Sequence, residues 1–195
     1  DVDYPAIFRQ GIQYDIPAIP TVDADTIVTS GKYYLSDGCT NRPVDQNGWL
    51  EVMRYFDDHI YHRYITYQGR TFERLLENGV WGDWCGRFYE NGWTWEKSLD
   101  GDLKCWYEYA LNNVNFNVKV ADSWYRPSET YKLTYPVKFA QNPQVFFSTE
   151  LGNTAGTVLT YTAVPSTTGC ALWLQKMVTG TANLKLAIQA VGRWK

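Results

Sequence analysis

The sequence lacks several features that mark common classes of protein. No stretch of its 195 residues approaches the roughly 18 apolar residues that a membrane span needs, so we expect no membrane insertion. Lys and Arg form no run longer than two and the net charge is −3, which argues against nucleic-acid binding. The chain begins without Met or a basic-then-apolar leader. We therefore expect no signal peptide and interpret the sequence as a piece of a longer protein.

Motifs for catalysis and for cofactors are also missing. The chain has no G-x-S-x-G elbow and no Gly-rich phosphate loop. Its two histidines, His59 and His62, lie on one short segment, and on a strand their odd separation would send them to opposite faces. No acid near the aromatic residues is marked by its surroundings as a glycosidase carboxylate; the candidates are Glu96, Asp100, Asp102 and Glu108. We predict a protein that is not an enzyme and that holds neither a cofactor nor a metal.

The four cysteines show no metal-binding or redox spacing. No pair of Cys39, Cys85, Cys105 and Cys170 has the C-x-x-C pattern. Two disulfides are possible, but a chain of this length does not need them for stability. We expect free and mostly buried thiols, and therefore assembly in a reducing compartment.

Aromatic residues are abundant, with 9 Trp and 15 Tyr. The stretch WGDWCGRFYENGWTW, residues 81–95, is either a sugar-binding surface or scaffold. Trp93 and Trp95 are two apart and would face the same way on a strand, as would Trp106 and Glu108. We expect the four tryptophans of the stretch to fill a core or the seam between two modules; these are Trp81, Trp84, Trp93 and Trp95.

The hydrophobic pattern of the first half predicts a small α+β module. Three prolines interrupt the first twenty residues, which we interpret as an extended leading segment. We predict a short helix over 22–29, with Thr21 as its N-cap and Gly31 as its stop. Strands follow over 31–36, 49–56 and 60–66, and residues 70–79 form either a strand end or one helical turn.

From about residue 92 the pattern predicts only β-strands. Asp100-Gly101 is a strong signal for a hairpin turn. Further strands begin near residues 132, 144, 157, 169 and 184, with turn residues between them. This regular spacing is typical of a β-sandwich or jelly roll.

One aromatic cluster lies in what we interpret as a long connection between strands. It consists of Asp122, Trp124, Tyr125 and Arg126. Loops on rigid scaffolds often carry function, so we predict that this cluster contacts a ligand or a partner. A contact between subunits of a trimer and a simple loop anchor are the alternatives.

Residues 22–84 resemble the pyocin-knob type module of bacteriophage tail fibres and related tail proteins. The matching pieces are DADTIVTSGKYY, TNRP, GWLEV, HIYHRYITY and TFERLLENGVWGDW. The last piece carries the closing motif of that module on Phe72, Arg74, Trp81 and Trp84. The histidine-rich strand departs from the Gln usual at that place.

The remainder is also similar to phage tail proteins, on the segments NGWTWEKSLDGDLKCW, TYPVKFAQNPQVFFS and AIQAVGRWK. The resemblance implies three parts: an extended segment over 1–21, a knob-like α+β module over 22–88 and an all-β, jelly-roll-like sandwich tip domain over 89–195. It further implies a homotrimer in the virion tail, assembled in the host cytoplasm, that attaches to other tail proteins through a missing N-terminal part.

The function that the resemblance implies is receptor binding at the bacterial surface. We expect non-covalent binding of a cell-surface saccharide during host cell adhesion, strengthened by several copies acting together. A structural module that only trimerises or caps a tail fibre is one alternative. A fragment of a polysaccharide depolymerase and a secreted lectin domain are others.

Overall fold

The computed structural model describes residues 18–19, 21–152, 158–162 and 165–195. Most of the leading segment predicted over 1–21 lies outside these residues. The chain divides into two compact units, with the division between Trp84 and Cys85. No helix within the described ranges is long and apolar enough to cross a membrane.

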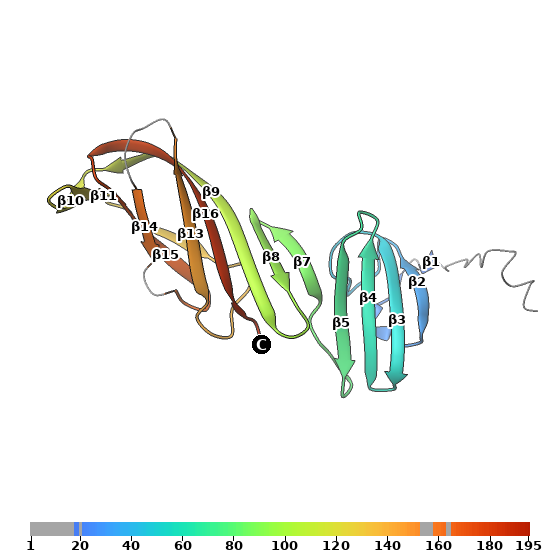
Figure 1. Ribbon diagram of the computed structural model, residues 1–195. Helices are drawn as coiled ribbons and strands as arrows, with labels where there is room; N and C mark the ends of the chain where they lie inside the picture. The colour runs from blue at the N-terminus through green and yellow to red at the C-terminus, as the bar shows by residue number, and fades with distance from the viewer. Residues whose placement is uncertain (1–17, 20, 153–157, 163–164) are drawn as a thin grey trace, which may run out of the picture. The chain divides into compact units, whose positions relative to one another are not determined.

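The first unit is built on one sheet with the strand order β1-β2-β3-β4-β5 (Figure 1). Neighbouring strands are antiparallel except β1 and β2, which are parallel. The short strand β6 pairs with β5. The bounds are β1 Ala18–Ile19, β2 Gly31–Leu35, β3 Gly48–Phe56, β4 His59–Thr66, β5 Thr71–Glu77 and β6 Val80–Trp81.

The predicted helix over 22–29, and with it the α+β class of the first module, is wrong. The described part of this unit contains only a single 3-10 turn, η1 (Ala24–Thr26), and its N-cap is Asp23 rather than Thr21. Part of the segment's backbone bonds to a distant residue: Ala24 N–H donates to the Thr40 carbonyl, and Thr40 N–H donates to the Val22 carbonyl. This pairing satisfies the Val22 carbonyl, which a helix would have bonded to the N–H four residues further on.

The strands of the first unit follow the predicted alternation. Ile60, His62, Tyr64 and Thr66 share one face of β4 and are all buried. The 70–79 segment, for which strand and helical turn were both open, forms strand β5. Its buried residues alternate in the same way, at Phe72, Arg74 and Leu76.

The second unit is the all-β sandwich that the sequence predicts. One sheet has the order β7-β8-β9-β16-β13, and the other has the order β10-β11-β15-β12, with β14 paired to β15. The bounds are β7 Cys85–Glu90, β8 Trp93–Lys97, β9 Asp102–Phe116, β10 Val118–Ala121, β11 Trp124–Arg126, β12 Tyr131–Thr134, β13 Gln144–Leu151, β14 Val158–Thr162, β15 Gly169–Lys176 and β16 Gly180–Arg193.

The hairpin predicted at Asp100-Gly101 is confirmed as the connection between β8 and β9. Gly101 has φ 100°, a conformation that favours glycine. Its backbone N–H donates to the Ser98 carbonyl and closes the turn. The tight turn fixes the register in which β8 pairs with β9.

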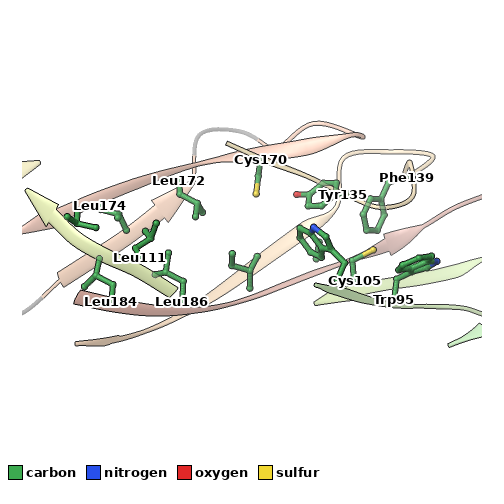
Figure 2. Packing of buried hydrophobic residues seen from close by; sticks show 14 of the residues in the cluster. Trp95, Cys105, Leu111, Tyr135, Phe139, Cys170, Leu172, Leu174, Leu184 and Leu186 are labelled. Atoms are coloured by element: carbon green, nitrogen blue, oxygen red, sulfur yellow. The ribbon is translucent and has the colours of Figure 1, made fainter. Parts of the chain in front are cut away.

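The core of the second unit lies between its two sheets. Figure 2 shows Leu184 and Leu186 of one sheet facing Leu172 and Leu174 of the other. The predicted alternation of β16 is confirmed, because Leu184, Leu186, Ile188 and Ala190 are each at most 2% exposed. The opposite sides of β9, β16 and β13 point out of the sandwich.

Candidate functional site

The four tryptophans of residues 81–95 are scaffold residues of two separate units. Trp93 and Trp95 are buried in the core of the second unit. Trp81 and Trp84 belong to the first unit, where the Arg74 guanidinium lies over both of their rings. The guanidinium carbon is 4.1 Å from one ring centroid and 4.3 Å from the other.

Arg74 is also held by hydrogen bonds. Its Nη1 donates to the Asp25 carboxylate at 2.5 Å, and its Nε donates to His62 Nδ1 at 3.3 Å. His62 in turn donates from Nε2 to the Ile27 carbonyl at 2.8 Å, since a carbonyl can only accept. Burial, together with the adjacent Arg74 cation, lowers the pKa of His62 to about 4. The cluster therefore consists of a neutral histidine and an arginine that contacts two tryptophan rings, and its hydrogen bonds join β4 and β5 to the segment that contains η1.

The two histidines lie on opposite faces of β4, as their spacing predicts. His59 is exposed, with its Nδ1 within 2.8 Å of an Asp58 carboxylate oxygen, whereas His62 is fully buried. Across the described residues, no group of three or more His, Cys, Asp or Glu side chains is placed to hold a metal ion.

The predicted free thiols are confirmed, because all four cysteines are unbridged and buried. Burial raises the pKa of Cys105 to about 12. It also raises the pKa of Cys170, which lies near Tyr135 in the core (Figure 2). These thiols are held in their unreactive, protonated form.

The aromatic cluster over 122–126 does not lie in a long connection. Strands β10 and β11 form a short antiparallel hairpin, with Asp122 and Ser123 exposed at its turn. Tyr125 packs against the core of the unit, while the Arg126 guanidinium lies over the Trp173 ring at 6.0 Å. Trp124 and Tyr125 are adjacent on one strand and therefore face opposite ways. The four predicted residues do not converge on one point.

The clearest candidate site is the outer face of β9, β16 and β13, which was not predicted from the sequence. The register aligns Trp106 of β9, Gln189 of β16 and Phe146 of β13 in one row across the sheet. Neighbouring strands are about 4.8 Å apart, so the Cα atoms of Trp106 and Phe146 lie about 10 Å apart. Phe146 is 54% exposed, which is unusual for a large apolar side chain on a sheet.

The next two rows along the same strands carry small and polar side chains. One row aligns Glu108, Ala187 and Ser148, and the following row aligns Ala110, Lys185 and Glu150. We call the three rows together the outer groove. Two adjoining hollows occupy it. One has a volume of about 570 Å³ beside the two rings, and the other has about 420 Å³ beside Lys185.

Trp106 is held from the side of β7. The Arg87 guanidinium lies 5.4 Å from the centre of the indole ring and pairs with Glu96 at 3.1 Å. The hydrogen bond to Glu96 raises the pKa of Arg87. By contrast, Glu108, Lys185 and Glu150 form no ion pair with any described residue. The outer groove therefore combines a fixed ring with polar groups that are available to a ligand.

The carboxylates weighed as glycosidase candidates separate into two groups. Glu96 and Glu108 lie on the outer face of the sheet. Asp100 and Asp102 lie at the β8–β9 turn, where the Ser98 hydroxyl donates to Asp100 and lowers its pKa. Asp102 pairs with Arg193 at 3.4 Å. The turn acids thus have structural partners within the unit.

No protein-family model and no curated protein match this sequence. Among solved structures, a C-terminal fragment of the R1 pyocin fibre of P. aeruginosa is 18% identical, with 90% of this chain and 67% of that chain covered and a TM-score of 0.40. An N-truncated R2-type pyocin tail fibre is 15% identical over 90% of this chain and 96% of its own, with a TM-score of 0.35. An N-truncated R1-type pyocin tail fibre is 19% identical over 55% of this chain and 84% of its own, with a TM-score of 0.43. At these identities and TM-scores the chain is similar to the fibres but is not assigned to their family.

Proposed function

We propose that this chain is part of a tail-fibre-type protein of a bacteriophage or phage-derived particle, and that its outer groove binds a saccharide of the bacterial surface. The tail-fibre part rests on the sequence resemblance, including the closing motif on Phe72, Arg74, Trp81 and Trp84. The saccharide part rests on one observation, the row of Trp106, Gln189 and Phe146 across the outer face.

That row fits the chemistry of a sugar ring. A pyranose has an apolar face of C–H groups and a rim of hydroxyls, and an aromatic side chain offers a rigid apolar face with little conformational entropy to lose. Gln189, between the two rings, can both donate to and accept from hydroxyls. A spacing of about 10 Å between the ring-bearing Cα atoms leaves room for one sugar ring above Gln189.

The adjoining rows can contact the next unit of a glycan chain. Ala187 gives a low floor that lets a ligand approach the sheet, while Glu108 and Ser148 on either side can bond to hydroxyls. A volume of about 570 Å³ in the first hollow lies within the range of small-molecule sites. The groove is shallow, so we expect weak binding by one copy and strong attachment only when several copies act together.

The hairpin over 122–126 is the second candidate contact. The Arg126 guanidinium over Trp173 and the exposed Asp122 would present a charged edge to a ligand. This hairpin belongs to the other sheet, so its contribution can be separated by mutation from that of the outer groove.

The test is decoration of whole bacteria by fluorescently labelled protein, with intact and with deglycosylated surfaces. We expect decoration that disappears with the glycan. We also expect Trp106→Ala to weaken binding roughly tenfold or more, the effect typical of a central aromatic contact. Tyr55→Ala is the matched control, because Tyr55 is an 81% exposed ring in the first unit.

Three outcomes would contradict the proposal in different ways. Loss of binding in Trp124→Ala, with Trp106→Ala unchanged, would move the site to the hairpin. A folded protein that decorates no strain would favour a purely structural role in a tail fibre. Release of reducing ends from the polysaccharide would favour a depolymerase.

A further inference from the structure

The sheet of the first unit has one covered face and one open face. Its covered face packs under the segment that contains η1, as the contacts of His62 and Arg74 show. The opposite face holds three rows of side chains fixed by the strand register, and we call it the open face. Its members are Tyr34, Trp49, Ile65 and Thr71 in the first row, Lys32, Glu51, Arg63 and Glu73 in the second, and Met53, Tyr61 and Leu75 in the third.

The middle row is a ladder of alternating charge. Across the four strands β2 to β5 it reads Lys32, Glu51, Arg63 and Glu73, which is positive, negative, positive, negative. The Glu51 carboxylate lies 3.0 Å from the Lys32 ammonium and 3.7 Å from the Arg63 guanidinium. The ladder has no net charge, and its two ends carry opposite signs.

The rows on either side of the ladder are largely apolar. In the first row, Tyr34 and Trp49 both contact the ring of Tyr67. The ring centroid of Tyr67 lies 5.7 Å from that of Tyr34 and 4.8 Å from that of Trp49. Tyr67 is nevertheless 63% exposed, and Met53 in the third row is 58% exposed. The other members of the two rows are partly exposed. Two partly exposed, largely apolar rows beside a neutral ladder are typical of a surface that another protein covers.

We propose that the open face packs against the same face of another copy of this chain, with Lys32 of one copy beside Glu73 of the next. Rotation about an axis parallel to the strands keeps each row at its own height, so apolar rows meet apolar rows. The same rotation brings the β2 side of one copy to the β5 side of its neighbour. This is true of a two-fold and of a three-fold axis, and in both cases opposite ladder ends meet.

The order of charges along the ladder favours a second copy of this chain as the partner of the open face. A like-charged ladder would repel its own copy, and a ladder with equal charges at both ends would bring like charges together. The observed order instead gives each end an opposite partner, and such complementarity favours one arrangement over others. The interface does not depend on the saccharide proposal, because it uses only the first unit.

The test is disulfide trapping in the full chain. Within one copy, positions 32 and 73 lie three strands apart, about 14 Å, which is beyond the Cα separation of about 7 Å that a disulfide can bridge. A disulfide between these positions in the Lys32→Cys, Glu73→Cys double variant must therefore join two copies. The four native cysteines are buried and will not compete. We expect a covalent multimer of the double variant under mild oxidation.

The controls separate this arrangement from others. Each single variant should stay largely uncrosslinked, because equivalent positions do not meet about such an axis. Sedimentation of the wild-type protein, whose cysteines are buried, should show self-association. Lys32→Glu should weaken this self-association at least tenfold. Lys138→Glu, which changes an exposed charge in the second unit, should leave it unchanged. A monomer at all concentrations, efficient crosslinking of either single variant, or a multimer whose double variant does not crosslink would overturn the proposal.

Discussion

Replacing Arg74 with Ala removes the cation at the centre of the cluster that joins the sheet of the first unit to η1. Arg74 is 3% exposed, contacts the rings of Trp81 and Trp84, and donates to Asp25 and His62. Removing one partner of a buried charged pair costs about 3–5 kcal/mol. Asp25 is partly exposed, so solvent would take over some of its lost hydrogen bonding. We therefore expect a loss of about 3 kcal/mol, the low end of that range.

The assay is urea unfolding followed by tryptophan fluorescence and circular dichroism. The two units can unfold in separate transitions, so the loss should appear in the transition that a fragment of the first unit also shows. Arg54→Ala is the matched control, because Arg54 forms a surface ion pair with Asp57 in the same unit and should cost less than about 1 kcal/mol. A loss below about 1 kcal/mol for Arg74→Ala would refute the role assigned to the cluster.

Three further predictions concern pH, thiol reactivity and packing. Because burial lowers the folded-state pKa of His62 to about 4, the unfolded chain binds a proton first as the pH falls below about 6.5. The contribution of His62 to stability should be constant above that pH and fall by about 3 kcal/mol between pH 6.5 and 4, and His62→Gln should flatten this part of the measured profile. Cys105 should stay unmodified by a thiol reagent at pH 8 until the protein is unfolded in urea, and rapid labelling of the native protein would contradict its burial. Gly169→Ala should destabilise the second unit by about 3 kcal/mol in thermal unfolding, because a Cβ at this position would lie 2.3 Å from the Leu133 carbonyl oxygen. Gly82→Ala is the control, because the nearest atom to its Cβ would be 3.4 Å away.

Most strands could be predicted from the sequence because alternation is a local signal. The buried series Leu184, Leu186 and Ile188 is visible without knowledge of the rest of the fold. The prediction of a helix over 22–29 was wrong because the backbone of Val22 and Ala24 bonds to Thr40, which is distant in sequence. No local pattern reports such a partner.

The outer groove illustrates the same limit of local patterns. That Trp106 and Glu108 share a face follows from their spacing alone. Gln189 and Phe146, however, join that face only through the registers of β16 with β9 and with β13. The signal available in the sequence was Phe146 itself, a ring between the polar outward positions of its strand. In the hairpin over 122–126, the local composition predicted a contact site, but one of the predicted residues, Tyr125, packs against the core of the unit.

The most direct test of saccharide binding in the outer groove follows the nine indole N–H signals of the protein by nuclear magnetic resonance. The protein is titrated with polysaccharide purified from a strain that it decorates. We expect the indole signal of Trp106 to shift progressively and to saturate, while those of the buried Trp93 and Trp95 stay in place. Saturable binding that leaves the Trp106 signal unmoved would contradict this expectation.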